Sequence, residues 1–97
     1  MITVNLTGSE KQILYAQAIV DNVNRKTWGV VERANDRVRK GTMPEKWAEI
    51  VYDCYVMVTS RWSKIFGNDA KKWIENKDRL SEEWVFKLAL QKYDETK

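Results

Sequence analysis

The stretch from Trp47 to Phe66 constrains the fold most, because its apolar residues recur at the spacing of a helix face. Steps of three and four residues stack side chains on one side of an α-helix. This series is Trp47, Val51, Cys54, Val58, Trp62 and Ile65, and a second apolar set, Ile50, Tyr52, Tyr55, Val56 and Met57, covers much of the remaining circumference. A helix that is apolar nearly all round needs partners on several sides. The sequence therefore predicts a central helix over about residues 44–66.

The length of 97 residues suits one domain with a single core, and no internal repeat or linker divides it. Apolar residues at helical spacing recur on both sides of the central stretch. We therefore expect an all-α fold, a small single-domain bundle of three to four helices spanning residues 1–97. Within it we expect an extended arm over residues 1–8 and a frayed tail over residues 93–97.

The first six residues alternate apolar and polar side chains, which is a strand pattern. A single short strand has nothing to pair with unless another chain supplies an edge. We favour an extended arm that lays Leu6 on the first helix, with a paired strand as the alternative. The helix then begins at one of two capping boxes, Thr7 with Glu10 or Ser9 with Gln12.

Residues 9–40 form either one long kinked helix or two helices that meet near Asn24. Asn24, Thr27 and Gly29 are all unfavourable in the middle of a helix. The apolar stripe nevertheless continues through Val30, Ala34 and Val38, which favours one helix. Gly41 is placed to end it in a left-handed conformation.

The central helix follows after a short connection, which predicts that it lies antiparallel to the first. Thr42 and Glu45 have the spacing of a capping box, and Pro44 falls where a first helical turn tolerates a missing N–H. Gly67 is expected to end the central helix.

Two shorter helices are expected after Gly67. Asn68 or Asp69 caps the first of them, and Ser81 caps the second. Their apolar residues are Ala70, Trp73 and Ile74 in the first helix, and Trp84, Val85, Leu88 and Ala89 in the second.

The composition makes an enzyme less favoured, because the chain contains no histidine. Histidine is the commonest general base and the commonest metal ligand. The single cysteine, Cys54, lies on the predicted core face, where we expect an inert thiol without a disulfide partner. We therefore expect no catalytic residue, metal site or cofactor.

The longest nearly uncharged run is far below the ~20 residues that cross a bilayer, and with no recognisable leader we expect a cytoplasmic protein.

The net positive charge is concentrated in residues 25–40. This segment has a net charge of +4 and the rest of the chain −1. Such a focused charge can attract phosphates or an acidic partner. Trp28 favours nucleic-acid binding, since an aromatic beside cations suits base stacking. The candidate anion-binding residues are Arg25, Lys26, Trp28, Arg33, Arg37 and Lys40.

The positive charge of residues 25–40 also has a purely structural explanation, which stays open. Glu32 and Asp36 neutralise part of the charge, and basic residues near a helix C-terminus favour the helix dipole without any ligand. Trp28 is equally suited to a core position. Asp53, isolated in an apolar run, is expected to pair with an arginine of this segment rather than to act with Glu49 as an acid–base pair.

Two segments resemble short helical proteins encoded by phages and prophages of Gram-positive bacteria. In that group a Thr-Gly-Ser-Glu-Lys-Gln helix start recurs together with an Ala-x-x-Trp-Ile-(Asp or Glu)-Asn-(Arg or Lys) segment. Here these correspond to residues 7–12 and 70–77, the latter with Ala70, Trp73, Asn76 and Lys77. The resemblance implies a mobile-element origin.

Together these observations predict a non-enzymatic binding protein of phage type. As an accessory of host takeover or anti-defence, it would engage an anionic target such as nucleic acid, a nucleotide signal or a host nucleoprotein through the basic helix face. The alternative is a homo-oligomeric assembly module, because four helices do not obviously cover Tyr52, Tyr55 and Met57.

Overall fold

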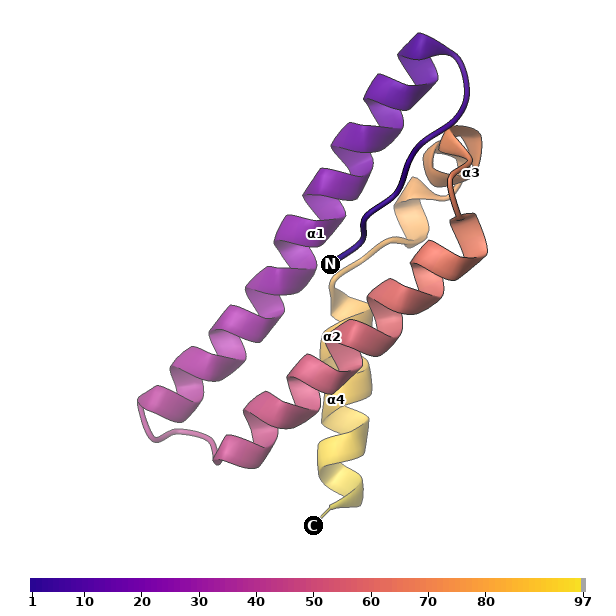
Figure 1. The fold of residues 1–97 in the computed structure, drawn as a ribbon. Coiled ribbons are helices and arrows are strands. Elements are labelled where there is room, and N and C mark those ends of the chain that lie inside the picture. Colours follow the sequence, from indigo (N-terminus) through magenta and orange to yellow (C-terminus); the bar gives the residue numbers. More distant parts are fainter. Residues whose placement is uncertain (97) are drawn as a thin grey trace.

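The computed structural model describes residues 1–96 and shows an all-α bundle (Figure 1). The described helices are α1 (Glu10–Arg39), α2 (Glu45–Phe66), α3 (Ala70–Glu75) and α4 (Glu83–Glu95), with a 3-10 turn, η1 (Lys77–Arg79), before α4. The molecule is elongated, with extents of 48 × 23 × 19 Å. A small helical bundle around the central apolar helix α2 is thus confirmed.

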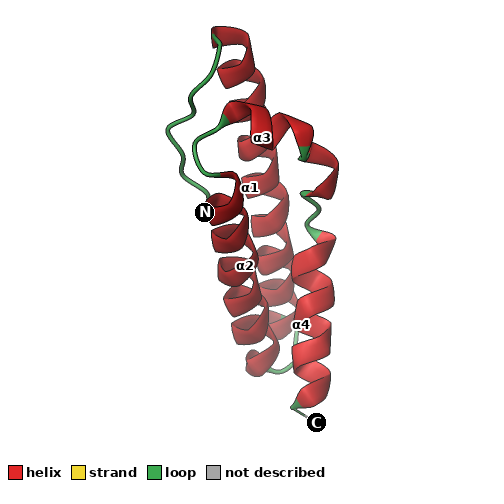
Figure 2. Ribbon diagram, turned by 90° about the vertical axis from the view of Figure 1, so that its right-hand side faces the viewer, coloured by secondary structure: helices red, strands yellow, loops and turns green. Residues whose placement is uncertain are grey.

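The long helices α1 and α2 run antiparallel and are joined at one end by a short loop, as the length of that connection predicted (Figure 1). Helix α4 lies alongside α2 and runs in the opposite direction, whereas α3 packs near the N-terminal end of α1 (Figure 2). Helix α2 therefore has α1 on one side and α4 on another.

The bundle has two core clusters along its length, and α1 and α2 pass through both. One cluster joins the second half of α1, the first half of α2 and α4; its buried members are Val30, Val31, Ala34, Trp47, Val51, Cys54, Tyr55, Val85 and Ala89. The other joins the arm, the first half of α1, the end of α2 and α3; its buried members are Ile2, Ala16, Val20, Val23, Trp62, Ala70, Trp73 and Leu80. Val58 packs against both clusters.

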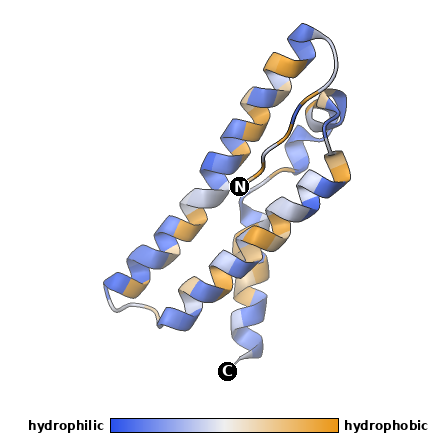
Figure 3. Cartoon of the chain, in the orientation of Figure 1, coloured by the Kyte–Doolittle hydropathy of each residue, from blue (hydrophilic) through white to orange (hydrophobic). Residues whose placement is uncertain are grey.

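The N-terminal residues form the expected extended arm, which alternates between apolar and polar residues as it runs back along α1 (Figure 3). Ile2 is buried, and Leu6 and Ile13 both pack against the second cluster. An isolated parallel bridge between Thr7 and Asp69 is the only strand-like pairing in residues 1–96. The arm is therefore part of the core and not a paired strand.

Helix α1 begins at the Ser9 register. The Ser9 hydroxyl accepts a hydrogen bond from the Gln12 backbone N–H (3.2 Å), and the Gln12 side chain accepts one from the Ser9 N–H (3.0 Å). These reciprocal bonds satisfy two N–H groups that lack a partner within the helix. The Thr7 hydroxyl instead donates to the Asn68 carbonyl at 3.2 Å, so the Thr7 register is wrong.

Residues 10–39 form one continuous helix, which confirms the single-helix interpretation (Figure 1). Thr27 is fully buried, and its hydroxyl donates to the Val23 carbonyl at 2.7 Å. This bond satisfies the hydroxyl within the helix, so Thr27 is tolerated there. Gly29 lies in the same helix without interrupting it.

The end of α1 is a Schellman motif. Gly41 has a positive φ of 76° and its N–H donates to the Val38 carbonyl (3.1 Å), while the Thr42 N–H donates to the Arg37 carbonyl (3.0 Å). These bonds close the last turn around Lys40, the C-cap. The predicted stop at Gly41 is confirmed.

The predicted capping box of Thr42 with Glu45 is wrong. The Thr42 hydroxyl donates to the Arg37 carbonyl at 3.0 Å, so it belongs to the end of α1. Pro44 is the N-cap of α2, with no side-chain cap bond, and the helix begins at Glu45.

The remaining boundaries lie within a residue of those predicted. Gly67 ends α2 with a φ of 55°, and the Asp69 side chain caps α3. Ser81 lies just before the N-cap Glu82, and its hydroxyl accepts from the Glu83 N–H at 3.2 Å.

Residues 93–95 are helical, although a frayed tail was predicted over residues 93–97. Helix α4 continues to Glu95, and the Tyr93 ring packs edge-on against Trp47 with 5.5 Å between ring centroids. This aromatic contact anchors the last turn of α4. Of the predicted frayed segment, Lys97 lies outside the described residues.

Candidate functional site

The basic side chains predicted to bind anions are exposed on α1. They are Arg25, Lys26, Arg33, Arg37 and Lys40, and Arg39 is exposed beside them. The helix places each residue about 100° around its axis from the one before. Lys26, Arg33, Arg37 and Lys40 therefore share one side of α1, which we call the basic flank, whereas Arg25 and Arg39 lie nearer the outer face.

Trp28 does not belong to the basic flank. It is about 140° around the helix axis from Arg33, and it is 41% exposed. Its ring meets Tyr55 edge-on at a centroid distance of 5.4 Å, and it lines a shallow hollow with Tyr52 and Asp53. The structure therefore does not bring Trp28 together with the arginines, although they lie in one segment of the sequence.

Two basic residues of the segment have partners within α1. Lys40 forms an ion pair with Asp36 (3.0 Å), and its hydrogen bond and charge lower the pKa of the Asp36 carboxyl from the usual 3.8. The Arg25 guanidinium donates to the Asn22 side chain at 2.7 Å. Both contacts are exposed local pairs of the kind that contributes little stability.

Arg33 and Arg37 form no ion pair with any carboxylate within residues 1–96. The Arg33 side chain lies back along the helix, so that a Cβ placed on Gly29 would be 3.6 Å from its Nη1. These two arginines are thus available to a ligand.

A groove of about 530 Å³ runs beside these two arginines, between α1 and α4. Glu82 and Glu83 line the α4 side of this groove. Its apolar lining is Val30, Ala34, Met43, Trp47, Phe86 and Leu90. The arginines therefore lie at the edge of a partly apolar groove with carboxylates on its opposite wall.

The expected ion pair of Asp53 with the basic segment is wrong. Asp53 is exposed and forms no ion pair within the described residues. It lies about 160° around α2 from Val51, which is fully buried, because two residues advance a helix by about 200°. Glu49 lines the same hollow as Asp53 and Trp28.

Cys54 is fully buried, as predicted, and has no disulfide. Burial raises the pKa of its thiol above the usual 9.0. A thiol that is raised in pKa and inaccessible is poorly nucleophilic. Across the part of the chain that the structure describes, no group of three or more Cys, Asp or Glu side chains is placed to hold a metal ion.

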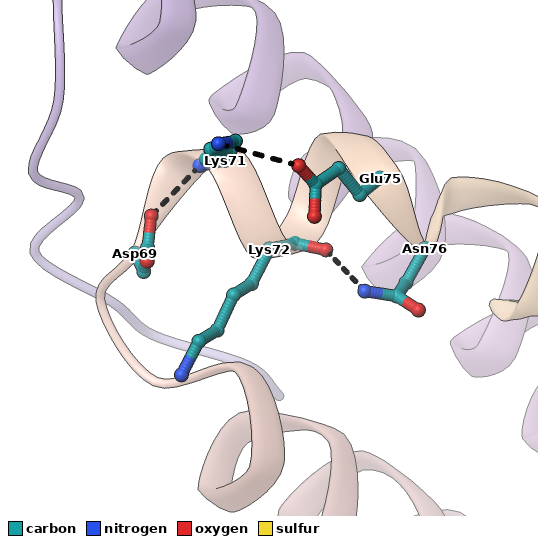
Figure 4. Close-up of polar contacts among 5 residues, drawn as sticks. All are labelled: Asp69, Lys71, Lys72, Glu75 and Asn76. Atoms are coloured by element: carbon teal, nitrogen blue, oxygen red, sulfur yellow. Dashed lines mark hydrogen bonds and ion pairs between the residues drawn. The ribbon is translucent and has the colours of Figure 1, made fainter.

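Lys71 and Lys72 lie on α3, where Lys71 forms an ion pair within the helix (Figure 4). The Lys71 ammonium pairs with Glu75 at 3.7 Å, and the Lys71 backbone N–H donates to the Asp69 side chain, the cap of α3, at 3.0 Å. Asn76 ends α3, and its side chain donates to the Lys72 carbonyl at 2.8 Å.

A third lysine near α3, Lys77, joins η1 to α1. Its ammonium donates to the Tyr15 hydroxyl at 2.8 Å, and this hydrogen bond raises the pKa of Lys77 above its usual 10.5.

A hollow larger than the two already described was not predicted from the sequence. A groove of about 840 Å³ lies between the second half of α2 and the start of α4, and we call it the α2–α4 groove. Trp84 lines it and is 57% exposed, and so does Ile65, at 56%. The sequence signal was the apolar stripe of α2, which reaches Ile65 near the end of the helix.

No helix within the described residues has the length and apolar character needed to span a membrane. A scan against protein-family models and searches of curated proteins and solved structures found no match to the chain. The assignment of a function therefore depends on the chain's own surface.

Proposed function

We propose that the protein is a non-enzymatic binding protein that engages the phosphates of a nucleic acid through the basic flank of α1. The observation that carries this proposal is that Arg33 and Arg37 are exposed, adjacent and without a carboxylate partner in the described residues. In the phage setting that the sequence resemblance implies, the target would be host nucleic acid or nucleoprotein.

The spacing of the cations favours a polymer over a single nucleotide. From Lys26 to Lys40 the helix rises about 21 Å, at 1.5 Å per residue. One phosphate group contacts only a small part of such a row, whereas a nucleic-acid strand carries a charge every ~3.4 Å of its axis. The carboxylates of Glu82 and Glu83 on the opposite wall disfavour phosphate contact inside the groove.

A salt series tests the proposal. Fluorescence anisotropy with labelled duplex DNA, single-stranded DNA and RNA hairpins should give an affinity that falls steeply with salt. Arg33→Glu/Arg37→Glu should weaken binding ~10-fold or more and reduce the slope of log K against log salt by about 2, since each phosphate contact contributes ~0.9.

The matched control is Arg25→Glu/Arg39→Glu, which makes the same change in net charge on the same helix but away from the basic flank. Thermal melting of both variants controls for the helix dipole, because Arg37 and Arg39 both lie in the last turn. Equal losses in the two variants would indicate a dependence on net charge alone and would overturn the proposal.

A second candidate function is homo-oligomeric assembly. Tyr52 and Val56 are exposed one turn apart on α2, and Tyr52 lines the same hollow as the half-exposed Trp28. Such aromatic surface is typical of protein interfaces. Of the residues that raised this alternative, Met57 is also exposed and Tyr55 is buried. A monomer by light scattering at tens of micromolar would exclude this candidate, and a Tyr52→Glu variant is its test if an oligomer is found.

A further inference from the structure

The α2–α4 groove continues the core stripe of α2 beyond the helices that cover it. Val58 and Trp62 pack in the core clusters, yet Ile65, on the same stripe, is more than half exposed. On the other wall, Leu88 packs against the core while Trp84, one turn earlier on α4, is exposed. The apolar part of the α2–α4 groove is therefore not covered by a third helix.

The length of the α2–α4 groove suits two turns of a bound helix. From Val58 to Ile65 α2 rises about 10 Å, and from Trp84 to Gln91 α4 rises by the same amount. These residues line the groove from its two sides. Apolar residues at positions i, i+4 and i+7 of a bound helix cover that length, as in other helix-in-groove complexes.

The rim of the groove is cationic. Arg61, Arg79 and Lys87 line it together with one carboxylate, Asp78. None of the three cations forms an ion pair within residues 1–96, and the Lys87 ammonium lies 5.9 Å from the centre of the Trp84 ring. The charge complement of this rim is acidic.

We propose that the α2–α4 groove receives an acidic amphipathic helix of a partner protein, which places its apolar residues between Ile65 and Trp84 and its carboxylates on Arg61, Arg79 and Lys87. A second copy of this chain fits less well, because a symmetric contact through the groove would bring identical cationic rims together. A nucleic acid would meet the cations but would leave the apolar floor unused.

The test uses a labelled, helix-stapled synthetic peptide of about three turns, with Leu at positions i, i+4 and i+7 and Glu on its other faces. The matched probe has Lys in place of Glu. Anisotropy should show binding of the acidic peptide and at least ~10-fold weaker binding of the basic one, as expected for opposite and like charges at an interface.

Trp84→Ala should weaken binding of the acidic peptide ~10-fold or more, the size of effect that removal of an aromatic anchor has in interfaces. The control is Phe86→Ala, an aromatic of the same helix that lines the other groove, between α1 and α4. Arg61→Glu/Lys87→Glu should reverse the preference between the two peptides. Arg33→Glu/Arg37→Glu should leave peptide binding unchanged, which separates this proposal from nucleic-acid binding by the basic flank.

Three outcomes would overturn the proposal. One is equal affinity for the two peptides, and another is equal effects of Trp84→Ala and Phe86→Ala. The third is a dimer in analytical ultracentrifugation that Trp84→Ala converts to a monomer, which would assign the groove to a second copy of the chain. Thermal melts of each variant identify any loss that comes from unfolding.

Discussion

The side-chain amide of Asn24 forms hydrogen bonds with both backbone polar groups of Ile2. Its Oδ1 accepts a hydrogen bond from the Ile2 N–H at 2.8 Å, and its Nδ2 donates to the Ile2 carbonyl at 2.9 Å. These bonds join the first residues of the arm to the middle of α1, and they bring the Ile2 side chain into the core, where it is buried. Asn24 is therefore a tertiary anchor.

Asn24→Ala should release the arm. The loss of two partly buried hydrogen bonds, together with some of the burial of Ile2, should lower the free energy of unfolding by about 1–3 kcal/mol. Hydrogen exchange of an N-terminal peptide should speed up before the rest of the protein unfolds. The control is Asn35→Ala, an exposed asparagine of the same helix, for which we expect little change. Equal exchange in both variants would show that the arm is held by its side chains alone.

The sequence predicts the extent of α1 but not the contact between Asn24 and Ile2. Helical spacing predicts the continuous stripe of α1, whereas the low helix propensity of Asn24 argues only against a helix at that position. The partner of Asn24 lies 22 residues away, and no periodicity connects the two. Tertiary hydrogen bonding thus overrides a local propensity in a way that a single sequence does not reveal.

The candidate site could have been predicted in part. Helix geometry alone separates Trp28 from Arg33, whereas their closeness in sequence favoured a joint site. The α2–α4 groove is different, because it depends on where α4 docks. The lengths and stripes of α2 and α4 do not determine that position, since the connection through α3 and η1 sets it.

The two segments that carry the sequence resemblance contact each other. The Thr7 N–H donates to the Asn68 carbonyl at 2.7 Å, and the Ala70 N–H donates to the Thr7 carbonyl at 3.1 Å. A Cβ on Gly8 would lie 3.4 Å from the Ala70 Cβ. This close packing joins the segment before α1 to the start of α3.

Gly29→Ala and Gly41→Ala should have opposite effects. Gly29 lies inside α1, where an added Cβ would meet only the Arg33 side chain at an ordinary contact distance. Alanine should therefore raise the free energy of unfolding by about 0.5–1 kcal/mol. Gly41 has a φ of +76°, so alanine there should lower it by about 1–2 kcal/mol. Urea denaturation measures both, and a loss at Gly29 would contradict the continuous helix.

Stability should fall as the pH rises above about 9. Burial raises the pKa of Cys54 above 9.0 and that of Tyr55 above 10.0. The unfolded chain therefore loses these protons at lower pH than the folded protein, so the stabilisation is complete below pH 9 and is lost as the pH rises through the folded-state values.

The double variant Cys54→Ala/Tyr55→Phe should have a flatter alkaline limb, measured by urea denaturation at each pH. Each group contributes at most about 1.4 kcal/mol per pH unit. The raised pKa of the exposed Lys77 acts in the same direction and remains in the variant as a constant background. An unchanged slope would mean that other groups cause the alkaline loss.

Trp28→Ala should distinguish the two roles of this residue, packing within the protein and stacking on a nucleic-acid base. Its ring packs edge-on against Tyr55, so its removal should lower the free energy of unfolding by about 1–2 kcal/mol. Because Trp28 lies on the other side of α1 from the basic flank, nucleic-acid affinity of the folded variant should change by no more than about twofold. A base stacked on Trp28 would contribute about 1–3 kcal/mol, which corresponds to a loss of about five- to 150-fold. Anisotropy measured well below the melting temperature distinguishes these results, and a tenfold loss would extend the binding surface around the helix to Trp28.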